Sequence, residues 1–368
     1  MAPSRATSDW ALPRGQAAAV WRPAAALWAL AFAASCATAP MSTGAKRSAD
    51  ETAPAAAAAP RETVNAPEPA AAETTRAETA PAAAASADTL VQAPAAEATR
   101  PAAVGRAEVR EIAIDSAAMG EKEWPALVVL PPAYRAEPDR RFPVLYILHG
   151  AGGDHVSWVD YLPLAALLQT RPAICVCVYG RAFGWYVDSP CQKNSQVETH
   201  VTGELVPFVD ANFRTIARKE GRGIFGYSMG GHGAITLAAK HPDLFSSASS
   251  ISGIMDLTRW PSNWRIAGAL GPLAANQDLW RRSSAMGLAG EFTKSAKGAR
   301  LLIECGTADF AYPENREFHA LLERLGIPHE YREGPGDHGM LYASGQHLAM
   351  HMDFHLASFA KALAGAER

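Results

Sequence analysis

The sequence lacks an excess of charge of either sign. Its 34 Lys and Arg residues are balanced by 37 Asp and Glu residues, and the formal net charge is -3. It also lacks a basic stripe of the kind that proteins present to phosphate backbones. The composition therefore predicts no nucleic-acid partner.

Large apolar residues are almost missing from one long segment. From about Ala37 to Gly105 the chain consists mostly of Ala, Pro, Thr and Glu. Such a segment cannot bury enough surface to offset the entropy lost on ordering, and its prolines make it semi-stiff. We therefore predict a disordered or extended linker over residues 37–106. The folded domain should then cover residues 107–368, a length that suits one α/β domain.

A hydrophobic run of membrane-spanning length is missing from the N-terminal region. Residues 24–34 are apolar, but this run is too short for an ordinary membrane-spanning helix. Positive charge precedes it, supplied by Arg5, Arg14 and Arg22. A short apolar run behind a basic segment is typical of a secretory signal, which we place over residues 1–36.

The end of this segment reads Ala-Ala-Ser-Cys, with the cysteine at Cys36. It resembles a bacterial lipoprotein signal, in which the cysteine becomes the lipidated first residue. Such signals usually carry Leu where this chain has Ala33. Ordinary cleavage near residues 37–39 and an unprocessed Ala-rich extension remain alternatives. We expect an exported protein, periplasmic or in the cell envelope, that is held at the membrane if Cys36 is lipidated.

Cysteine is scarce, with five residues in the whole chain. Cys175 and Cys177 are two apart in an apolar run, so they point to the same side of a strand and cannot easily bridge each other. None of the spacings suits a zinc site. We expect buried thiols, although a disulfide involving Cys191 stays open in an oxidising compartment.

Apolar runs and helical patterns alternate through residues 107–368. Residues 142–148 and 173–178 are almost continuously apolar, which is typical of central strands buried on both faces. Further strands are expected over 108–115, 126–130, 222–225, 245–251, 299–305 and 330–333, and helices over 197–213, 231–241, 315–325 and 345–363. This order predicts a mostly parallel central sheet with helices on both faces.

A G-x-S-x-G motif occupies residues 226–230, with a short apolar strand before it and a helix after it. That context is the one in which Ser228 would stand on a sharp strand-to-helix turn, exposed at the carboxyl edge of the sheet. The helix that follows points its N-terminus at the site, where it favours developing negative charge. The motif predicts that Ser228 is a nucleophile.

A serine nucleophile needs a base. In the α/β-hydrolases, whose serine turn this motif resembles, the catalytic residues follow the order nucleophile, acid, histidine. Asp309 follows a predicted strand, and His338 lies in a Gly-rich loop before the last helix. We therefore assign Asp309 as the acid and His338 as the base. Asp337 is the competing acid, but a side chain adjacent to His338 in sequence reaches the Nδ1 atom poorly.

Two backbone N–H groups are needed to hold the oxyanion. Met229, directly after the nucleophile, should supply one of them. The second should come from the loop His-Gly-Ala-Gly-Gly at residues 149–153, which follows a predicted strand. We assign it to Ala151, with Gly152 as the alternative.

Two other regions carry residues of potential chemical interest. His347, His351 and His355 recur every four residues on one predicted helix, a spacing that suits a metal ion. Neither a carboxylate nor a cysteine completes the set, so we predict a solvated or half-buried stripe and no metal site. Residues 254–297 hold Trp260, Trp264 and Trp280 where hydrolases of this fold often insert a cap. Their rings line a substrate cleft or anchor a long loop.

The motifs together resemble one esterase family of the α/β-hydrolase fold. The stretches LYILHGAGGDHVSW, GWYVDSP, GIFGYSMGGHGAITLAAKHPDLF and GPGDH occur in order between about Val144 and Phe359. The family includes S-formylglutathione hydrolases, feruloyl and acetylxylan esterases, and antigen 85 mycolyltransferases. The resemblance implies the same triad and oxyanion donors. It also implies that Trp185, Tyr186 and Asp188 border the substrate cleft.

The function that this resemblance implies is ester hydrolysis by a serine carboxylesterase, through an acyl-enzyme that needs no metal or organic cofactor. Small-molecule or glycan-linked esters are the expected substrates. Acyl transfer of the antigen 85 type and hydrolysis of S-formylglutathione remain alternatives. A binding or envelope protein without catalysis would not require the complete triad and both oxyanion loops.

Overall fold

The computed structural model describes residues 105–160, 162–294, 298–339 and 344–366. The predicted signal segment, its Cys36 and almost all of the predicted linker lie outside these residues. The described chain forms one sheet of eight strands in the order β1-β2-β4-β3-β5-β6-β7-β8. The strands are β1 (Glu108–Ser116), β2 (Glu121–Leu130), β3 (Val144–Leu148), β4 (Ile174–Val178), β5 (Arg222–Tyr227), β6 (Ser247–Ile251), β7 (Arg300–Gly306) and β8 (His329–Gly334).

All pairings from β4 to β8 are parallel, whereas β1 pairs antiparallel with β2 and β2 antiparallel with β4. The predicted mostly parallel sheet is therefore confirmed. The main departure lies in β2, which begins at Glu121, five residues before the apolar run at 126–130. Its first three residues are exposed and polar, so hydrophobicity alone did not mark them.

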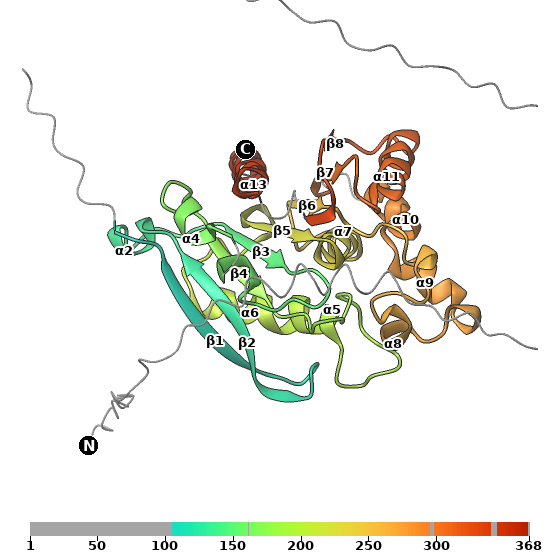
Figure 1. Ribbon diagram of the computed structural model, residues 1–368. Helices are drawn as coiled ribbons and strands as arrows, with labels where there is room; N and C mark the ends of the chain where they lie inside the picture. The colour runs from blue at the N-terminus through green and yellow to red at the C-terminus, as the bar shows by residue number, and fades with distance from the viewer. Residues whose placement is uncertain (1–104, 161, 295–297, 340–343, 367–368) are drawn as a thin grey trace, which may run out of the picture. The chain divides into compact units, whose positions relative to one another are not determined.

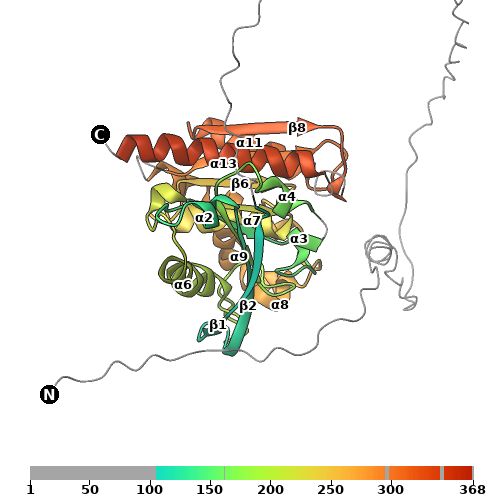
Figure 2. The same cartoon turned by 90° about the vertical axis from the view of Figure 1, so that its left-hand side faces the viewer.

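Helices cover both faces of the sheet because alternate strand residues point in opposite directions. In β3, Val144, Tyr146 and Leu148 pack in one core with residues of α6 (Val206–Asn212) and α7 (Met229–Lys240). Leu145 and Ile147 pack in the other core with residues of α3 (Ser157–Asp160), α4 (Leu164–Leu167) and α13 (Gly345–Ala366). Figure 1 shows α4 and α13 on the opposite side of the sheet from α6, and Figure 2 shows α13 as a long helix whose axis runs roughly in the direction of β8.

The predicted helix over 197–213 is interrupted by a π-helical turn. It consists of α5 (Val197–Thr199), the π-helix η1 (His200–Leu205) and α6. A π turn inserts one residue into the helix and is uncommon outside functional or strained positions. His200 and Glu204 of this turn form a polar cluster with Ser116 at the end of β1.

Short helices fill the predicted cap region between β6 and β7. Trp280 is fully buried there and donates its indole N–H to the carbonyl of Gly271. Trp260 and Trp264 are only half-buried. The segments are η3 (Leu257–Arg259), α8 (Ile266–Leu270), η4 (Leu273–Ala275), α9 (Gln277–Ser283), α10 (Ala285–Leu288) and η5 (Ala289–Thr293). The remaining helices are α2 (Ala133–Ala136), η2 (Lys219–Gly221) and α11 (Tyr312–Arg324). Within the described residues, none of the helices has the length and apolarity to cross a membrane.

Two of the three histidines in the α13 stripe are fully buried, so the prediction of a solvated or half-buried stripe was wrong for these two. His351 and His355 have no exposed surface. Their ring nitrogens lie within 2.7–3.0 Å of hydroxyl or carboxylate oxygens on β6 and β7. The ladder runs from the half-buried His347 through Glu304, His351, Ser249 and His355 to Ser247. These histidines tie the last helix to the sheet.

Acid should destabilise the fold between pH 6.5 and 4.5. Burial lowers the pKa of His149 and of His232 from 6.5 to about 4, and that of His355 well below 6.5. Below pH 6.5 these histidines are therefore protonated in the unfolded chain but stay neutral in the folded chain. The free energy of unfolding decreases as the pH is lowered. Each such histidine should cost about 1.4 kcal/mol per pH unit in this window. Denaturant unfolding at several pH values measures this slope, and a flat profile would contradict it.

Candidate active site

Ser228 stands at the turn between β5 and α7 in a strained conformation. Its φ of 55° and ψ of -118° are rarely adopted by residues other than glycine. Gly226 and Gly230 make this turn possible, because a Cβ on Gly226 would lie 2.2 Å from the backbone of Gly230. A Cβ on Gly230 would meet the carbonyl oxygen of Leu148 at the same distance. The sequence therefore folds into a tight elbow that projects Ser228 from the carboxyl end of a central strand.

Three predicted residues meet at this edge of the sheet. Ser228 Oγ lies 2.9 Å from His338 Nε2. His338 Nδ1 lies 3.0 Å from both carboxylate oxygens of Asp309, which follows β7. Burial opposes ionisation of Asp309, but the hydrogen bond and charge of His338 outweigh it and lower the pKa of the carboxyl. The arrangement can remove a proton from the serine hydroxyl and stabilise the resulting imidazolium.

The carboxylate of Asp337, the competing candidate for the acid, makes a different contact. It is exposed, and its Oδ1 accepts a hydrogen bond from the backbone N–H of Gly339 at 3.0 Å. The carboxylate that faces His338 Nδ1 belongs to Asp309. The geometry thus favours Asp309 over its sequence neighbour as the acid partner.

The two predicted oxyanion donors flank the serine from different strands. Met229 opens α7, a helix of 12 residues whose N-terminus carries partial positive charge. Ala151 lies in the loop after β3, beside Gly150, where a Cβ would sit 3.5 Å from Ser228 Cβ. The N–H of Gly152 is already used, because it donates to the carbonyl of Ala182 at 2.6 Å. Ala151 therefore fits the second donor better than the alternative, Gly152.

Trp185 and Tyr186 are placed behind the site instead of on its surface. Both rings have no exposed area, and both residues have left-handed backbones with φ of 53° and 54°. The Tyr186 hydroxyl donates to the carbonyl of His149 and Trp185 Nε1 donates to that of Trp264. Side chains without exposed surface cannot touch substrate, so the implied contact is corrected to a supporting position under two active-site loops.

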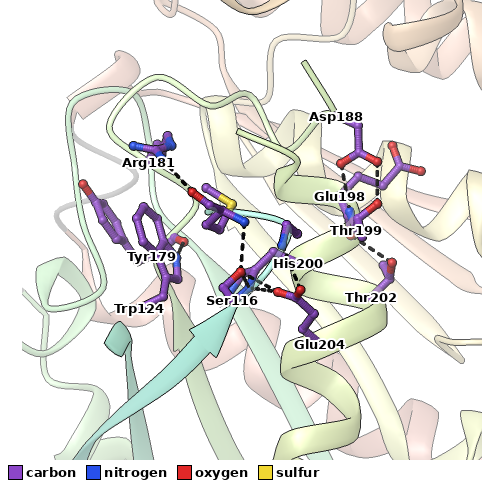
Figure 3. Close-up of polar contacts among 12 residues, drawn as sticks. Ser116, Trp124, Tyr179, Arg181, Asp188, Glu198, Thr199, His200, Thr202 and Glu204 are labelled. Atoms are coloured by element: carbon purple, nitrogen blue, oxygen red, sulfur yellow. Dashed lines mark hydrogen bonds and ion pairs between the residues drawn. The ribbon is translucent and has the colours of Figure 1, made fainter. Parts of the chain in front are cut away.

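Asp188 also makes a structural contact. Its carboxylate accepts hydrogen bonds from the backbone N–H of Thr199 at 2.9 Å and from its hydroxyl at 2.6 Å (Figure 3). These bonds cap the start of the helix that continues into the π turn. The residue is half-buried, and its oxygens are directed at this cap.

Sequence reasoning did not identify the rings that flank His338. The Phe310 ring centroid lies 4.3 Å from that of the imidazole, and the Tyr227 centroid lies 5.1 Å from it on a different strand. The Tyr227 hydroxyl also donates to the His338 carbonyl at 2.8 Å. The sequence offered one signal for each ring: Tyr227 directly precedes Ser228, and Phe310 directly follows Asp309. Neither signal predicts that both rings converge on the same histidine.

Apart from the Ser-His-Asp arrangement, a cluster of one serine, one histidine and one glutamate joins β1 to the π turn (Figure 3). Ser116 Oγ lies 3.0 Å from His200 Nδ1 and 2.5 Å from Glu204 Oε2, which itself lies 2.9 Å from the same Nδ1. A proton relay needs the two imidazole nitrogens on different partners, whereas here one nitrogen faces both. Within the described residues, His200 Nε2 has no partner. The cluster is therefore a structural tie.

The cysteines are consistent with the expectation of buried thiols. Cys175, Cys177 and Cys305 are buried and free, and burial raises the pKa of each thiol. Cys191 is exposed and also free. Within the described residues, groups of three or more side chains suited to a metal ion do not occur.

Comparison with known proteins matches most of the described chain. A family model described as "Putative esterase" matches residues 116–354. The chain is 35% identical over 238 residues to Esterase Rv1288 of Mycobacterium tuberculosis. The aligned region covers 57% of this chain and 51% of that protein. The chain thus spans about half the length of that relative.

Solved structures share the architecture. An S-formylglutathione hydrolase from Agrobacterium tumefaciens has a TM-score of 0.60 at 23% identity, covering 71% of this chain and 99% of that one. A ferulic acid esterase has a TM-score of 0.59 at 21% identity, covering 69% and 99%. At such identities the likeness concerns the fold alone, and it confirms the predicted α/β-hydrolase fold.

Proposed function

The chain belongs to the esterase family matched at residues 116–354, and from that membership we propose that it hydrolyses carboxylic esters as a serine esterase. The membership confirms the resemblance drawn from the sequence motifs. The observation that carries the proposal is the continuous hydrogen-bonded series from Asp309 through His338 to Ser228. It stands beside two backbone N–H groups that are suited to an oxyanion.

The reaction proceeds in two halves. Ser228 Oγ attacks the ester carbonyl carbon while His338 Nε2 takes the hydroxyl proton, and the N–H groups of Ala151 and Met229 hold the oxyanion. The bond to the alcohol oxygen then breaks, and His338 protonates that oxygen. Water enters, gives a proton to His338 and attacks the acyl carbon of the acyl-enzyme. The bond from that carbon to Ser228 Oγ then breaks, His338 returns the proton to Oγ, and the acid is released. Asp309 keeps the imidazole in the tautomer that both halves require.

The test has two arms on the same preparation. A fluorophosphonate probe should label the protein at Ser228, because only an activated serine reacts with it. A panel of aryl esters with different acyl lengths, together with feruloyl and acetyl sugars, should then give turnover. Product analysis with and without an acceptor alcohol distinguishes hydrolysis from acyl transfer. A protein that takes no label and turns over none of these esters would contradict the proposal.

We also propose that the enzyme acts outside the cytoplasm. The support is the basic and apolar segment over residues 1–36, followed by the Pro-rich segment over residues 37–106. A Pro-rich chain spans about 3.1 Å per residue, so a lipid on Cys36 would hold the domain within roughly 200 Å of the membrane. That reach suits bulky or envelope-bound esters.

This proposal predicts both a location and a substrate preference. An antibody to the catalytic domain should detect the protein in the envelope or periplasmic fraction of its source cells. Acylated sugars or short-chain lipid esters should exceed S-formylglutathione in kcat/KM, because the thioester is a cytosolic metabolite. Recovery of a shortened chain in the cytosol, with a clear preference for S-formylglutathione, would contradict both parts.

A further inference from the structure

We propose that Phe310, Trp264 and Trp260 form a subsite that binds the alcohol part of the ester and favours alcohols with a flat apolar face. The inference rests on the proposed esterase function and adds a specificity to it. The three residues come from the loop after β7 and from the cap, which are distant in sequence. We call them the aromatic subsite.

The rings of the aromatic subsite form one continuous surface that reaches His338. Phe310 lies 4.3 Å from the imidazole, and Trp264 stacks on Phe310 at 5.4 Å with an interplanar angle of 27°. Trp260 meets Phe310 edge-on at 5.4 Å and lies 5.1 Å from Trp264. Phe310 is 40% exposed, one of the few large apolar side chains that face solvent. Contiguous exposed apolar surface on a folded protein often marks a binding site, and this surface lies beside the reactive imidazole.

The backbone under Trp264 is held in an unfavourable conformation. Trp264 and Arg265 both have left-handed backbones, with φ of 42° and 54°. The carbonyl of Trp264 accepts the indole N–H of buried Trp185 at 3.0 Å, and Trp185 has a left-handed backbone too. Consecutive residues of this kind cost free energy and persist where the surroundings enforce them. The surrounding structure therefore holds Trp264 in an unfavourable backbone conformation that places its ring against Phe310.

Sheet order places the aromatic subsite on the alcohol side of the reaction. Ser228 follows β5, Ala151 follows β3 and Phe310 follows β7. In the sheet, β3 and β7 lie on opposite sides of β5 (Figure 1). Neighbouring strands are about 4.8 Å apart, so the oxyanion donor and Phe310 lie on opposite sides of the serine. His338 must protonate the leaving oxygen, which therefore approaches its Nε2. A group attached to that oxygen is therefore expected to meet Phe310, whose ring lies closer to the imidazole than that of Tyr227 among the described residues.

The test compares esters that share an acetyl group and differ in the alcohol. The ratio of kcat/KM for 2-naphthylmethyl acetate to that for methyl acetate cancels general damage to the triad, because both leaving groups are alkoxides that need protonation by His338. Phe310→Ala should lower this ratio about tenfold, as expected for loss of one aromatic contact, and Trp264→Ala should lower it in the same direction. Phe310→Tyr, which keeps the ring, should restore most of it. Leu325→Ala, a truncation of another exposed apolar residue at 41% exposure, is the matched control and should leave the ratio unchanged.

Two outcomes would overturn the inference. Equal losses on both acetates would show that Phe310 only positions His338. The second outcome is a change in acyl-length preference. If Phe310→Ala altered the relative kcat/KM values along a series of phenyl esters of increasing acyl length, the rings would lie on the acyl side instead.

A binding measurement separates failure of the subsite from failure of the proposed function. The alcohol product 2-naphthylmethanol should bind the Ser228→Ala protein in a calorimetric titration, and adding Phe310→Ala should weaken this binding about tenfold. If the wild-type protein hydrolyses no ester, the esterase proposal fails, and this titration still decides whether the rings bind a flat alcohol. Absence of 2-naphthylmethanol binding in an active esterase would refute the aromatic subsite alone.

Discussion

Replacing Ser228 with alanine should lower kcat for ester hydrolysis by about a million-fold. Triads of this kind lose roughly that factor when the nucleophile is removed, because no other group can form the acyl-enzyme. In this structure His338 Nε2 would face a methyl group where it now faces the Oγ atom at 2.9 Å. The remaining rate over water would come from the oxyanion donors and from substrate binding. Initial rates on an aryl acetate, with the variant expressed and purified free of host esterases, measure the loss.

The same variant should lose its fluorophosphonate label while keeping its fold. Ser228 is 7% exposed, and its side chain is a single hydroxymethyl group, so the free energy of unfolding should change by about 1 kcal/mol or less. Circular dichroism and a denaturant midpoint check this. A pure, folded Ser228→Ala protein that retained a tenth of the activity would remove Ser228 from the mechanism.

The elements that carry the triad were predictable because their signals are local. A continuous apolar run marks a strand buried on two faces, as in β3 and β4, and the G-x-S-x-G motif marks the elbow where β5 ends. The acid and the base followed from chain order and from their positions just after strands. In a parallel sheet such positions share one edge, so His338 meets Ser228 across 110 residues of sequence and Asp309 meets His338 across 29.

The parts that sequence did not predict depend on where side chains point. Trp185 and Tyr186 lie in a motif that the resemblance placed at the border of the cleft, yet both residues have left-handed backbones and both rings are buried. The spacing of His351 and His355 suits one helix face, but only the structure places Glu304 and Ser249 opposite that face. Phe310 is a single aromatic residue after Asp309, and its importance comes from Trp264 in a distant segment. None of these relations has a local sequence signal.

Asp309→Asn should lower kcat by about ten-thousand-fold, the second-largest loss that we expect. The backbone N–H of Ala311 donates to Asp309 Oδ1 at 2.8 Å, so an asparagine would keep its oxygen there and direct its amide N–H at His338 Nδ1. That nitrogen would then have to accept, and the imidazole proton would move to Nε2. An Nε2–H group facing Ser228 cannot remove the hydroxyl proton. The geometry would survive while the tautomer became unproductive.

Asp337→Asn is the matched control, because it makes the same chemical change one residue from His338. Its carboxylate is exposed and accepts from the Gly339 N–H, a bond that the asparagine oxygen can also accept. We expect a change in kcat within about threefold, since the Asp309 carboxylate still sets the tautomer. Fluorophosphonate labelling rates of the two variants, measured beside kcat, report serine activation directly and should rank in the same order. If Asp337→Asn lost more activity than Asp309→Asn, the acid role would pass to Asp337, and the hydrogen bonds between Asp309 and His338 would have to be structural.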